Sequence, residues 1–153
     1  MTGGQTGADR AALDFAIAHG IPHCGWCPRG RLAEDGKIGS WYQLMETPSD
    51  DPLQRTEWNV RDSEAVSIFS ISRQLTGGSR KAFEFAVKYQ KPCIHLSREI
   101  EENAASRKLG EFLFKHRPGS LNVGGPRHSE EPEVGAFVRN VLEQVWARHL
   151  CKD

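Results

Sequence analysis

The sequence predicts one α/β domain, residues 1–153, with a three-layer Rossmann-like architecture and a mainly parallel sheet. Two observations lead to this prediction. Short apolar stretches typical of buried strands alternate with helical patterns, which favours parallel βαβ units. The length of 153 residues also fits a single domain that can bury a core without disulfides or metal.

In the first half of the chain, a helix is predicted from Thr6 to His19, with apolar residues on one face. Thr6 and Asp9 have the spacing of a capping box, and Gly20 and Pro22 end the helix. The next predicted elements are a short strand at Ile21–Cys24, a loop-rich stretch from Gly25 to Pro52 and a short helix at Leu53–Asp62. Because long loops in compact domains are usually functional or disordered, and this one carries aromatic residues, we expect part of it to be ordered.

In the second half, the stretch Ala65–Ser70 (AVSIFS) is the clearest buried strand and is predicted to be central. The elements predicted after it are a helix at Gly78–Tyr89, a strand at Pro92–Leu96, a helix at Glu99–His116 with a bend at Gly110, a strand at Ser120–Val123 and a closing helix at Pro132–Cys151. Strands and helices thus alternate to the end of the chain.

The glycine-rich turn Gly3–Gly7 opens the first helix with no strand before it. In a parallel βαβ fold such a turn follows a strand. We therefore expect either that residues upstream of Met1 supply the first strand or that its place in the sheet is empty.

Composition excludes several classes of partner. Lys and Arg number 20 and Asp and Glu number 20, so no global field favours a nucleic acid or an anionic membrane. No apolar stretch is long enough to span a bilayer, and no signal peptide is evident, so a cytoplasmic location is expected. Cys24 and Cys27 form a CxxC without a second pair of ligands, which favours reduced thiols over zinc.

Three glycine pairs are predicted to lie at one edge of the sheet, where strands lead into helices. They are Gly3-Gly4, Gly77-Gly78 and Gly124-Gly125. Glycine lets backbone N–H groups approach an anion, and a helix N-terminus adds partial positive charge. Hydroxyls of Thr6, Thr76 and Ser79 add donors, so an anion or phosphate site is predicted. Neither GxGxxG nor a Walker motif is present, which argues against a standard NAD or ATP mode.

Further candidates lie in and beside the loops. Arg29 and Arg31 flank a glycine, and their guanidinium groups suit phosphate or carboxylate; Arg10, Arg55 and Arg61 are similar. Trp26 and Trp58 offer aromatic faces for a heterocycle. The alternatives are that the arginines lie on a solvated loop and that the tryptophans pack under it.

Several of these stretches together resemble the molybdenum carrier family, which is similar to the Lonely-guy-like Rossmann proteins. The stretches that carry the resemblance are Gly3–Asp14 (GGQTGADRAALD), Gly25–Gly36 (GWCPRGRLAEDG), Arg55–Ser63 (RTEWNVRDS), Leu75–Ser79 (LTGGS) and Leu121–Arg127 (LNVGGPR). The resemblance implies a homo-oligomer that binds molybdenum cofactor, a phosphorylated pyranopterin, with a molybdoenzyme as a recipient.

No protein metal cluster is then required, because the dithiolene of the ligand holds the molybdenum. Glycines and hydroxyls would cradle the phosphate, arginines would close over it and a tryptophan would stack on the ring. The expected ligand-binding residues are Gly3, Gly4, Gln5, Thr6, Gly7, Asp9, Arg10, Trp26, Arg29, Arg31, Trp58, Arg61, Thr76, Gly77, Gly78, Ser79, Asn122 and Gly124.

The alternative function is a nucleoside-monophosphate phosphoribohydrolase, an N-glycosidic hydrolase of the wider Lonely-guy-like group with a GGxGTxxE motif. Gly77, Gly78 and Glu84 match that motif, and Glu84 would be the catalytic carboxylate. Arg80 and Lys81 replace its second glycine and its threonine, which favours binding over hydrolysis. A redox module built on Cys24 and Cys27 is the third possibility.

Overall fold

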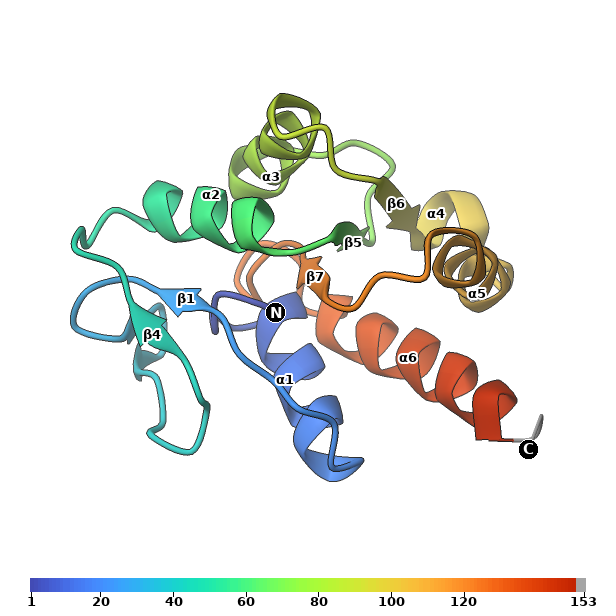
Figure 1. Ribbon diagram of the computed structural model, residues 1–153, viewed down its shortest axis with the longest axis horizontal. Coiled ribbons are helices and arrows are strands. Elements are labelled where there is room, and N and C mark those ends of the chain that lie inside the picture. The colour runs from blue at the N-terminus through green and yellow to red at the C-terminus, as the bar shows by residue number, and fades with distance from the viewer. Residues whose placement is uncertain (151–153) are drawn as a thin grey trace.

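A parallel sheet lies between two layers of helices in the computed structural model, which describes residues 1–150 (Figure 1). Strands β6 (Cys93–Ser97), β5 (Ala65–Ser70) and β7 (Leu121–Gly124) are neighbours in that order, and both pairings are parallel. The α/β fold class and the central place of AVSIFS are therefore confirmed.

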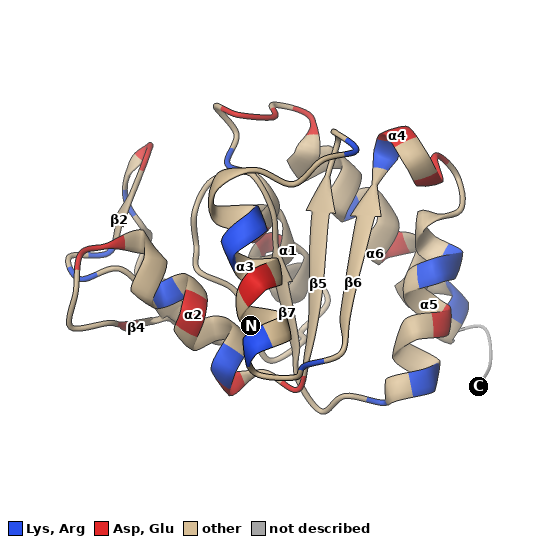
Figure 2. Cartoon of the chain, turned by 90° about the horizontal axis from the view of Figure 1, so that it is seen from above, with Lys and Arg blue, Asp and Glu red and all other residues tan. Residues whose placement is uncertain are grey.

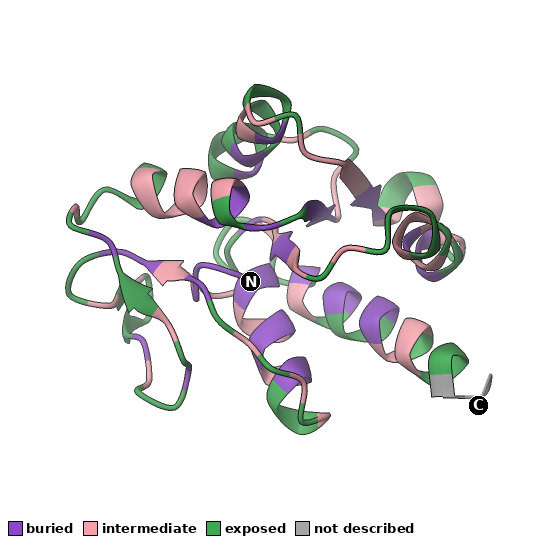
Figure 3. Ribbon diagram, viewed as in Figure 1, coloured by how far each residue is buried: buried purple, intermediate pink, exposed green. Residues whose placement is uncertain are grey.

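The side chains of β5 alternate between two apolar cores, although the whole strand is buried. Val66 and Ile68 pack with α2 (Pro52–Asp62) and α3 (Gly77–Lys88) on one face. Phe69 packs on the other face against α1 (Ala8–Ala18), α5 (Ala105–His116) and α6 (Val134–Leu150). Figure 3 shows the consequence, with buried residues on β5 and on the inner sides of the helices.

Residues 1–2 lie beside β7, so the place of the expected first strand in the sheet is not empty. The nitrogen of Met1 donates to the Leu121 carbonyl at 2.6 Å, and the Val123 N–H donates to the Met1 carbonyl at 2.9 Å. Thr2 N–H then donates to the Cys24 carbonyl at 3.2 Å. Main-chain hydrogen bonding thus continues from the sheet into the segment that begins at Cys24.

The loop-rich stretch is an ordered subdomain of short strands. β1 (Trp26–Cys27) pairs in parallel with β4 (Met45–Glu46), and β2 (Leu32–Ala33) forms an antiparallel hairpin with β3 (Gly36–Lys37). A third core beneath it contains Leu13, Cys27, Ile38 and Tyr42. Arg31 holds the subdomain together by donating to four backbone carbonyls, those of Ile38, Gly39, Tyr42 and Leu44.

Three predicted details of the first half are wrong or shifted. Ile21–Cys24 is not a strand, because the chain pairs only from Cys24 onward. Thr6 does not cap α1, which begins at Ala8 after Gly7; its hydroxyl instead bonds to Glu34. The Asp9 carboxylate accepts from Gln5 N–H at 3.3 Å, so the capping-box pairing is not formed.

In the second half, the predicted helix Glu99–His116 is two helices, α4 (Arg98–Glu101) and α5. The break lies at Glu102, which has a positive φ of 43°, and Gly110 lies inside α5. Of the predicted closing helix, Cys151 lies outside the described residues.

Within residues 1–150, no helix combines the length and the apolar character needed to cross a membrane. Figure 2 shows Lys and Arg interspersed with Asp and Glu on α2, α3 and α5. Local ion pairs such as Arg107–Glu111 on α5 match this pattern.

Candidate ligand-binding site

The three glycine turns meet around one small cavity of about 60 Å³. Its glycine lining comes from Gly3, from Gly78 at the start of α3, and from Gly124 and Gly125 at the end of β7. Polar side chains complete the wall, and these are Asp9, Arg55, Thr56, Asn59, Ser79 and Asn122. The cavity therefore combines backbone that an anion can approach closely with several side-chain donors.

A buried ion pair sets one wall of this glycine-lined cavity. Arg55 Nη1 lies 3.0 Å from Asp9 Oδ2, and the two side chains are 15% and 5% exposed. Burial raises the pKa of Asp9, while the Arg55 charge and the Gln5 N–H act against that rise. Among the described residues the buried Arg55 Nε has no hydrogen-bond partner, so protein groups do not satisfy every donor of this guanidinium.

Ser79 and Asn122 supply two further uncommitted groups. Both line the cavity, and they are only 6% and 5% exposed. Neither side chain makes a hydrogen bond within the part of the chain that the structure describes, residues 1–150. Their polar atoms are not among the buried unpartnered ones of the described residues, so they are open to the cavity and available to a polar ligand group.

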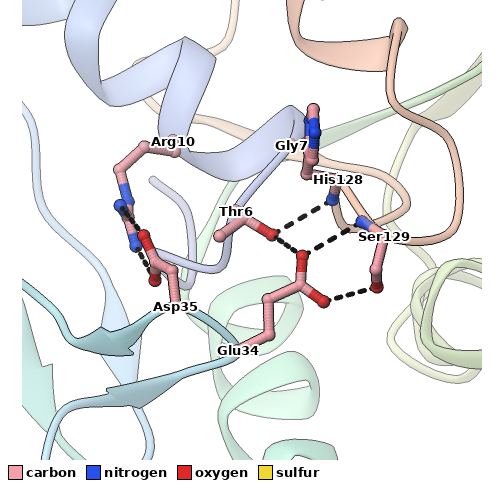
Figure 4. A pocket seen from close by; sticks show the side chains of 7 residues that line it. All are labelled: Thr6, Gly7, Arg10, Glu34, Asp35, His128 and Ser129. Atoms are coloured by element: carbon pink, nitrogen blue, oxygen red, sulfur yellow. Dashed lines mark hydrogen bonds and ion pairs between the residues drawn. The ribbon is translucent and has the colours of Figure 1, made fainter.

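A second, larger pocket of about 550 Å³ lies at the turn before α1. Its lining residues are Thr6, Gly7, Arg10, Glu34, Asp35, His128 and Ser129 (Figure 4). Gly7 is required here, because a Cβ on it would lie 2.5 Å from the Pro126 carbonyl oxygen and 2.8 Å from the His128 nitrogen. The turn before α1 and the turn after β7 therefore pack backbone against backbone.

Carboxylates of the β2–β3 hairpin enter this pocket. Glu34 accepts from the Thr6 hydroxyl and from the Ser129 N–H and hydroxyl, and Asp35 accepts from Arg10 at 3.0 and 3.2 Å. The hydrogen bonds from Ser129 and Thr6 lower the pKa of Glu34 to about 2. The hairpin tip is thus attached to the sheet edge through charge-assisted hydrogen bonds.

This attachment predicts a specific acid sensitivity. The pKa of Glu34 is lower in the folded protein than the ordinary value of 4.5, so its stabilisation is present above pH 4.5 and is lost as the pH falls toward about 2. Glu34→Gln is expected to lose less stability than wild type over that range. Urea unfolding at a series of pH values measures the difference, and parallel pH curves for the two proteins would contradict it.

The family profile of the circularly permutated YpsA SLOG family matches residues 1–146. This chain belongs to that family. The SLOG protein is also similar to a solved structure from Syntrophus aciditrophicus that is named putative molybdenum carrier protein, with 45% identity, a TM-score of 0.91, and coverage of 94% of this chain and 91% of that one. No curated protein matches the sequence.

Several predicted site residues of this SLOG protein lie away from both pockets. Trp26 and Trp58 contact each other edge to face, with ring centroids 4.8 Å apart. Arg61 lies over the Trp58 ring at 4.6 Å and pairs with Asp62, which also accepts from the Trp26 indole. The two tryptophans are therefore occupied by packing, and the structure does not bring them to a ligand pocket.

The two loop arginines are also engaged elsewhere. Arg29 is exposed and lies 3.9 Å from Asp50. The Arg31 guanidinium is taken up by backbone carbonyls of its own loop, so it serves the subdomain and does not close over either pocket.

Glu84, the carboxylate of the hydrolase alternative, lies on the exposed side of α3. It pairs with Lys81 at 2.8 Å and with Arg80 at 3.3 Å, and the hydrogen bond from Lys81 is the main cause of its lowered pKa. It lines neither of the two pockets. The two residues that depart from the hydrolase motif are thus the partners that hold this carboxylate at the surface.

The described cysteines do not form a site either. Cys24 is exposed, Cys27 is buried and Cys93 is partly buried, and no disulfide joins them. Residues 1–150 contain no cluster of three or more His, Cys, Asp or Glu side chains placed to hold a metal.

Sequence reasoning missed several pocket residues, namely Glu34, Asp35, Thr56, Asn59, His128 and Ser129. Glu34 and Asp35 precede Gly36, a pattern typical of a hairpin turn, which was the available signal. Ser129 and His128 follow the last glycine pair by only a few residues.

Proposed function

We propose that this SLOG protein binds and carries a small molecule with a phosphate end, and that its cargo is molybdenum cofactor or a similar phosphorylated pterin. The observation that carries the proposal is the glycine-lined cavity with its uncommitted donors on Arg55, Ser79 and Asn122. The name of the Syntrophus relative supports the choice of cargo.

The size of the cavity limits which part of the ligand enters it. A volume of about 60 Å³ suits one phosphate-sized group, since a water molecule in the liquid takes about 30 Å³. The phosphate end would lie inside, near the first N–H groups of α3, which lack partners within the helix. The heterocycle would lie outside the cavity, at the sheet edge.

The residues present fit a cargo that brings its own metal ligands. No cysteine lines either of the two pockets described above, so the protein offers no thiolate for molybdenum there. The dithiolene of the pterin would hold the metal, and the chain would hold the phosphate. Self-association and delivery to a molybdoenzyme belong to the same proposal and rest on the family resemblance, and a cytoplasmic location is proposed with them.

The proposal predicts that Gly78→Ala weakens binding without harming the fold. A Cβ on Gly78 meets no heavy atom within 4 Å, so the protein accommodates it, yet it adds bulk to the cavity lining. Loss of one charge-assisted hydrogen bond costs about 1.5–3 kcal/mol, so the affinity for a nucleoside monophosphate or inorganic phosphate should fall at least about tenfold. Isothermal titration calorimetry measures this change.

Two variants control this experiment. Gly110→Ala places a Cβ in equally open space on α5, and Glu84→Gln removes a charge on the exposed side of α3. Both should leave the affinity within a few-fold of wild type. Equal affinity of Gly78→Ala and wild type would contradict a phosphate site in the cavity, and release of free base that Glu84→Gln abolishes would favour the hydrolase.

A further inference from the structure

The tip of the β2–β3 hairpin places a carboxylate on a set of donors that belongs to two distant segments. Thr6 stands before α1, and Ser129 stands after β7. Glu34 Oε1 accepts from the Thr6 hydroxyl and from Ser129 N–H at 3.1 Å, and Glu34 Oε2 accepts from the Ser129 hydroxyl at 2.5 Å. Figure 4 shows these side chains pointing toward one another.

The donors themselves are organised without help from Glu34. The Thr6 hydroxyl also accepts from His128 N–H at 3.0 Å, which fixes the direction in which Thr6 donates. The tight packing of Gly7 against residues 126–128 holds the two segments together. The Thr6 hydroxyl and the backbone beside Ser129 are therefore held in place by the protein, and the Ser129 hydroxyl adds a third donor. One N–H and two O–H donors together have the recognition chemistry of an oxyanion.

The turn of the hairpin, Glu34 and Asp35, is attached to the sheet edge by polar contacts, whereas Ala33 beside it packs on the third core. Besides those of the Glu34 carboxylate, these polar contacts are the Glu34 N–H on the Gln5 side chain at 3.0 Å and the Asp35–Arg10 pair. Leu32 and residues 34–37 are exposed, whereas Ile38 at the base of the hairpin is buried in the third core. The tip can therefore leave while the base stays in place.

We propose that Thr6 and Ser129 form a second oxyanion seat, and that Glu34 occupies it as a built-in competitor that a phosphate group displaces. This inference rests on the proposed function, because it assigns a regulator to the same sheet edge. Asp35 then moves with Glu34, which frees the Arg10 guanidinium to face the incoming anion. The hairpin thereby sets the concentration of phosphate ligand at which the donors of Thr6 and Ser129 in the larger pocket become available.

The test is an NMR titration with inorganic phosphate. The backbone amide signals of Ser129 and Ser79 are monitored as phosphate is added. Ser129 reports the proposed seat, and Ser79 reports the glycine-lined cavity. In Glu34→Ala the Ser129 amide should saturate at a phosphate concentration at least about tenfold lower than in wild type. Glu46→Ala is the matched control, since Glu46 is another loop glutamate that accepts from a backbone N–H, that of Gly30.

A second pair of variants separates an emptied seat from a general loosening of the hairpin. Adding Thr6→Val to Glu34→Ala removes one donor at nearly constant shape, so it should reverse most of the gain. Glu34→Gln keeps the side-chain length without the charge and should show a smaller gain in the same direction.

The two amide signals distinguish failure of this inference from failure of the proposed function. An identical Ser129 response in wild type and Glu34→Ala overturns the built-in competitor, even where Ser79 responds and the phosphate cavity stands. A Ser129 gain in Glu34→Ala without any Ser79 response supports the seat and contradicts the cavity. No response of either amide in any variant overturns both.

Discussion

Replacing Gly25 with alanine is expected to lower the free energy of unfolding by about 3 kcal/mol, the upper end of the usual cost of overpacking. A Cβ on Gly25 would lie 1.9 Å from the Thr2 carbonyl oxygen and 2.9 Å from the Thr2 nitrogen. Both are backbone atoms, and Thr2 N–H also bonds to the neighbouring Cys24 carbonyl. The clash therefore separates residues 1–2 from the segment beginning at Cys24.

Urea unfolding measures this effect, with Gly110→Ala as the control. Gly110 lies within α5, where a Cβ meets open space, so alanine should stabilise that helix by about 0.5–1 kcal/mol. A Gly25→Ala protein as stable as wild type would show that the main-chain bonding from β7 through Thr2 to Cys24 does not contribute to the fold.

Arg55→Met is expected to cost about 3 kcal/mol at pH 7, because it leaves the Asp9 carboxylate buried without its counter-charge. Arg107→Met is the matched control, since Arg107 and Glu111 are 59% and 63% exposed and such pairs contribute little. Chemical denaturation of the two variants gives the comparison. Equally small decreases in the free energy of unfolding for Arg55→Met and Arg107→Met would mean that the Asp9–Arg55 pair is not structurally important.

The pH dependence of the Arg55→Met variant follows from the same ion pair. Burial raises the folded-state pKa of Asp9 above 3.8, so protonation favours the folded state, and that contribution is lost as the pH rises through the folded pKa. The Arg55 charge lowers this pKa, so removing Arg55 raises the folded-state pKa of Asp9 further. The stability contributed by protonated Asp9 is then lost over a pH range that extends upward. The destabilisation should therefore be smaller near pH 4 than at pH 7, and Asp9→Asn should restore much of the stability of Arg55→Met.

The parts of the fold predicted correctly are those encoded by local patterns. The stretch Ala65–Ser70 is buried on both faces and is apolar apart from two serines, and its predicted bounds equal those of β5. Residues 1–2 and the strands of two residues each between Trp26 and Glu46 carry no periodicity, because their pairing is set by partners far along the chain. The sequence alone therefore indicated a loop where the structure has an ordered subdomain.

The residues of the candidate site also divide into those that local sequence patterns predict and those that they do not. Glycine pairs after predicted strands place backbone at one sheet edge, and the cavity contains Gly3, Gly78 and Gly124. The Asp9–Arg55 pair joins residues 46 positions apart, and Glu34 reaches Ser129 across 95 positions. Such contacts leave no trace in spacing, and the same is true of the backbone carbonyls that engage Arg31.

The most direct test of the carrier account is native mass spectrometry of wild type, Gly78→Ala and Gly110→Ala, each mixed with molybdenum cofactor and then desalted. The account predicts that wild type and Gly110→Ala retain a phosphorus-containing pterin adduct and that Gly78→Ala loses it. Equal retention by all three proteins, or no adduct on wild type, would contradict a phosphorylated cargo held at the glycine-lined cavity.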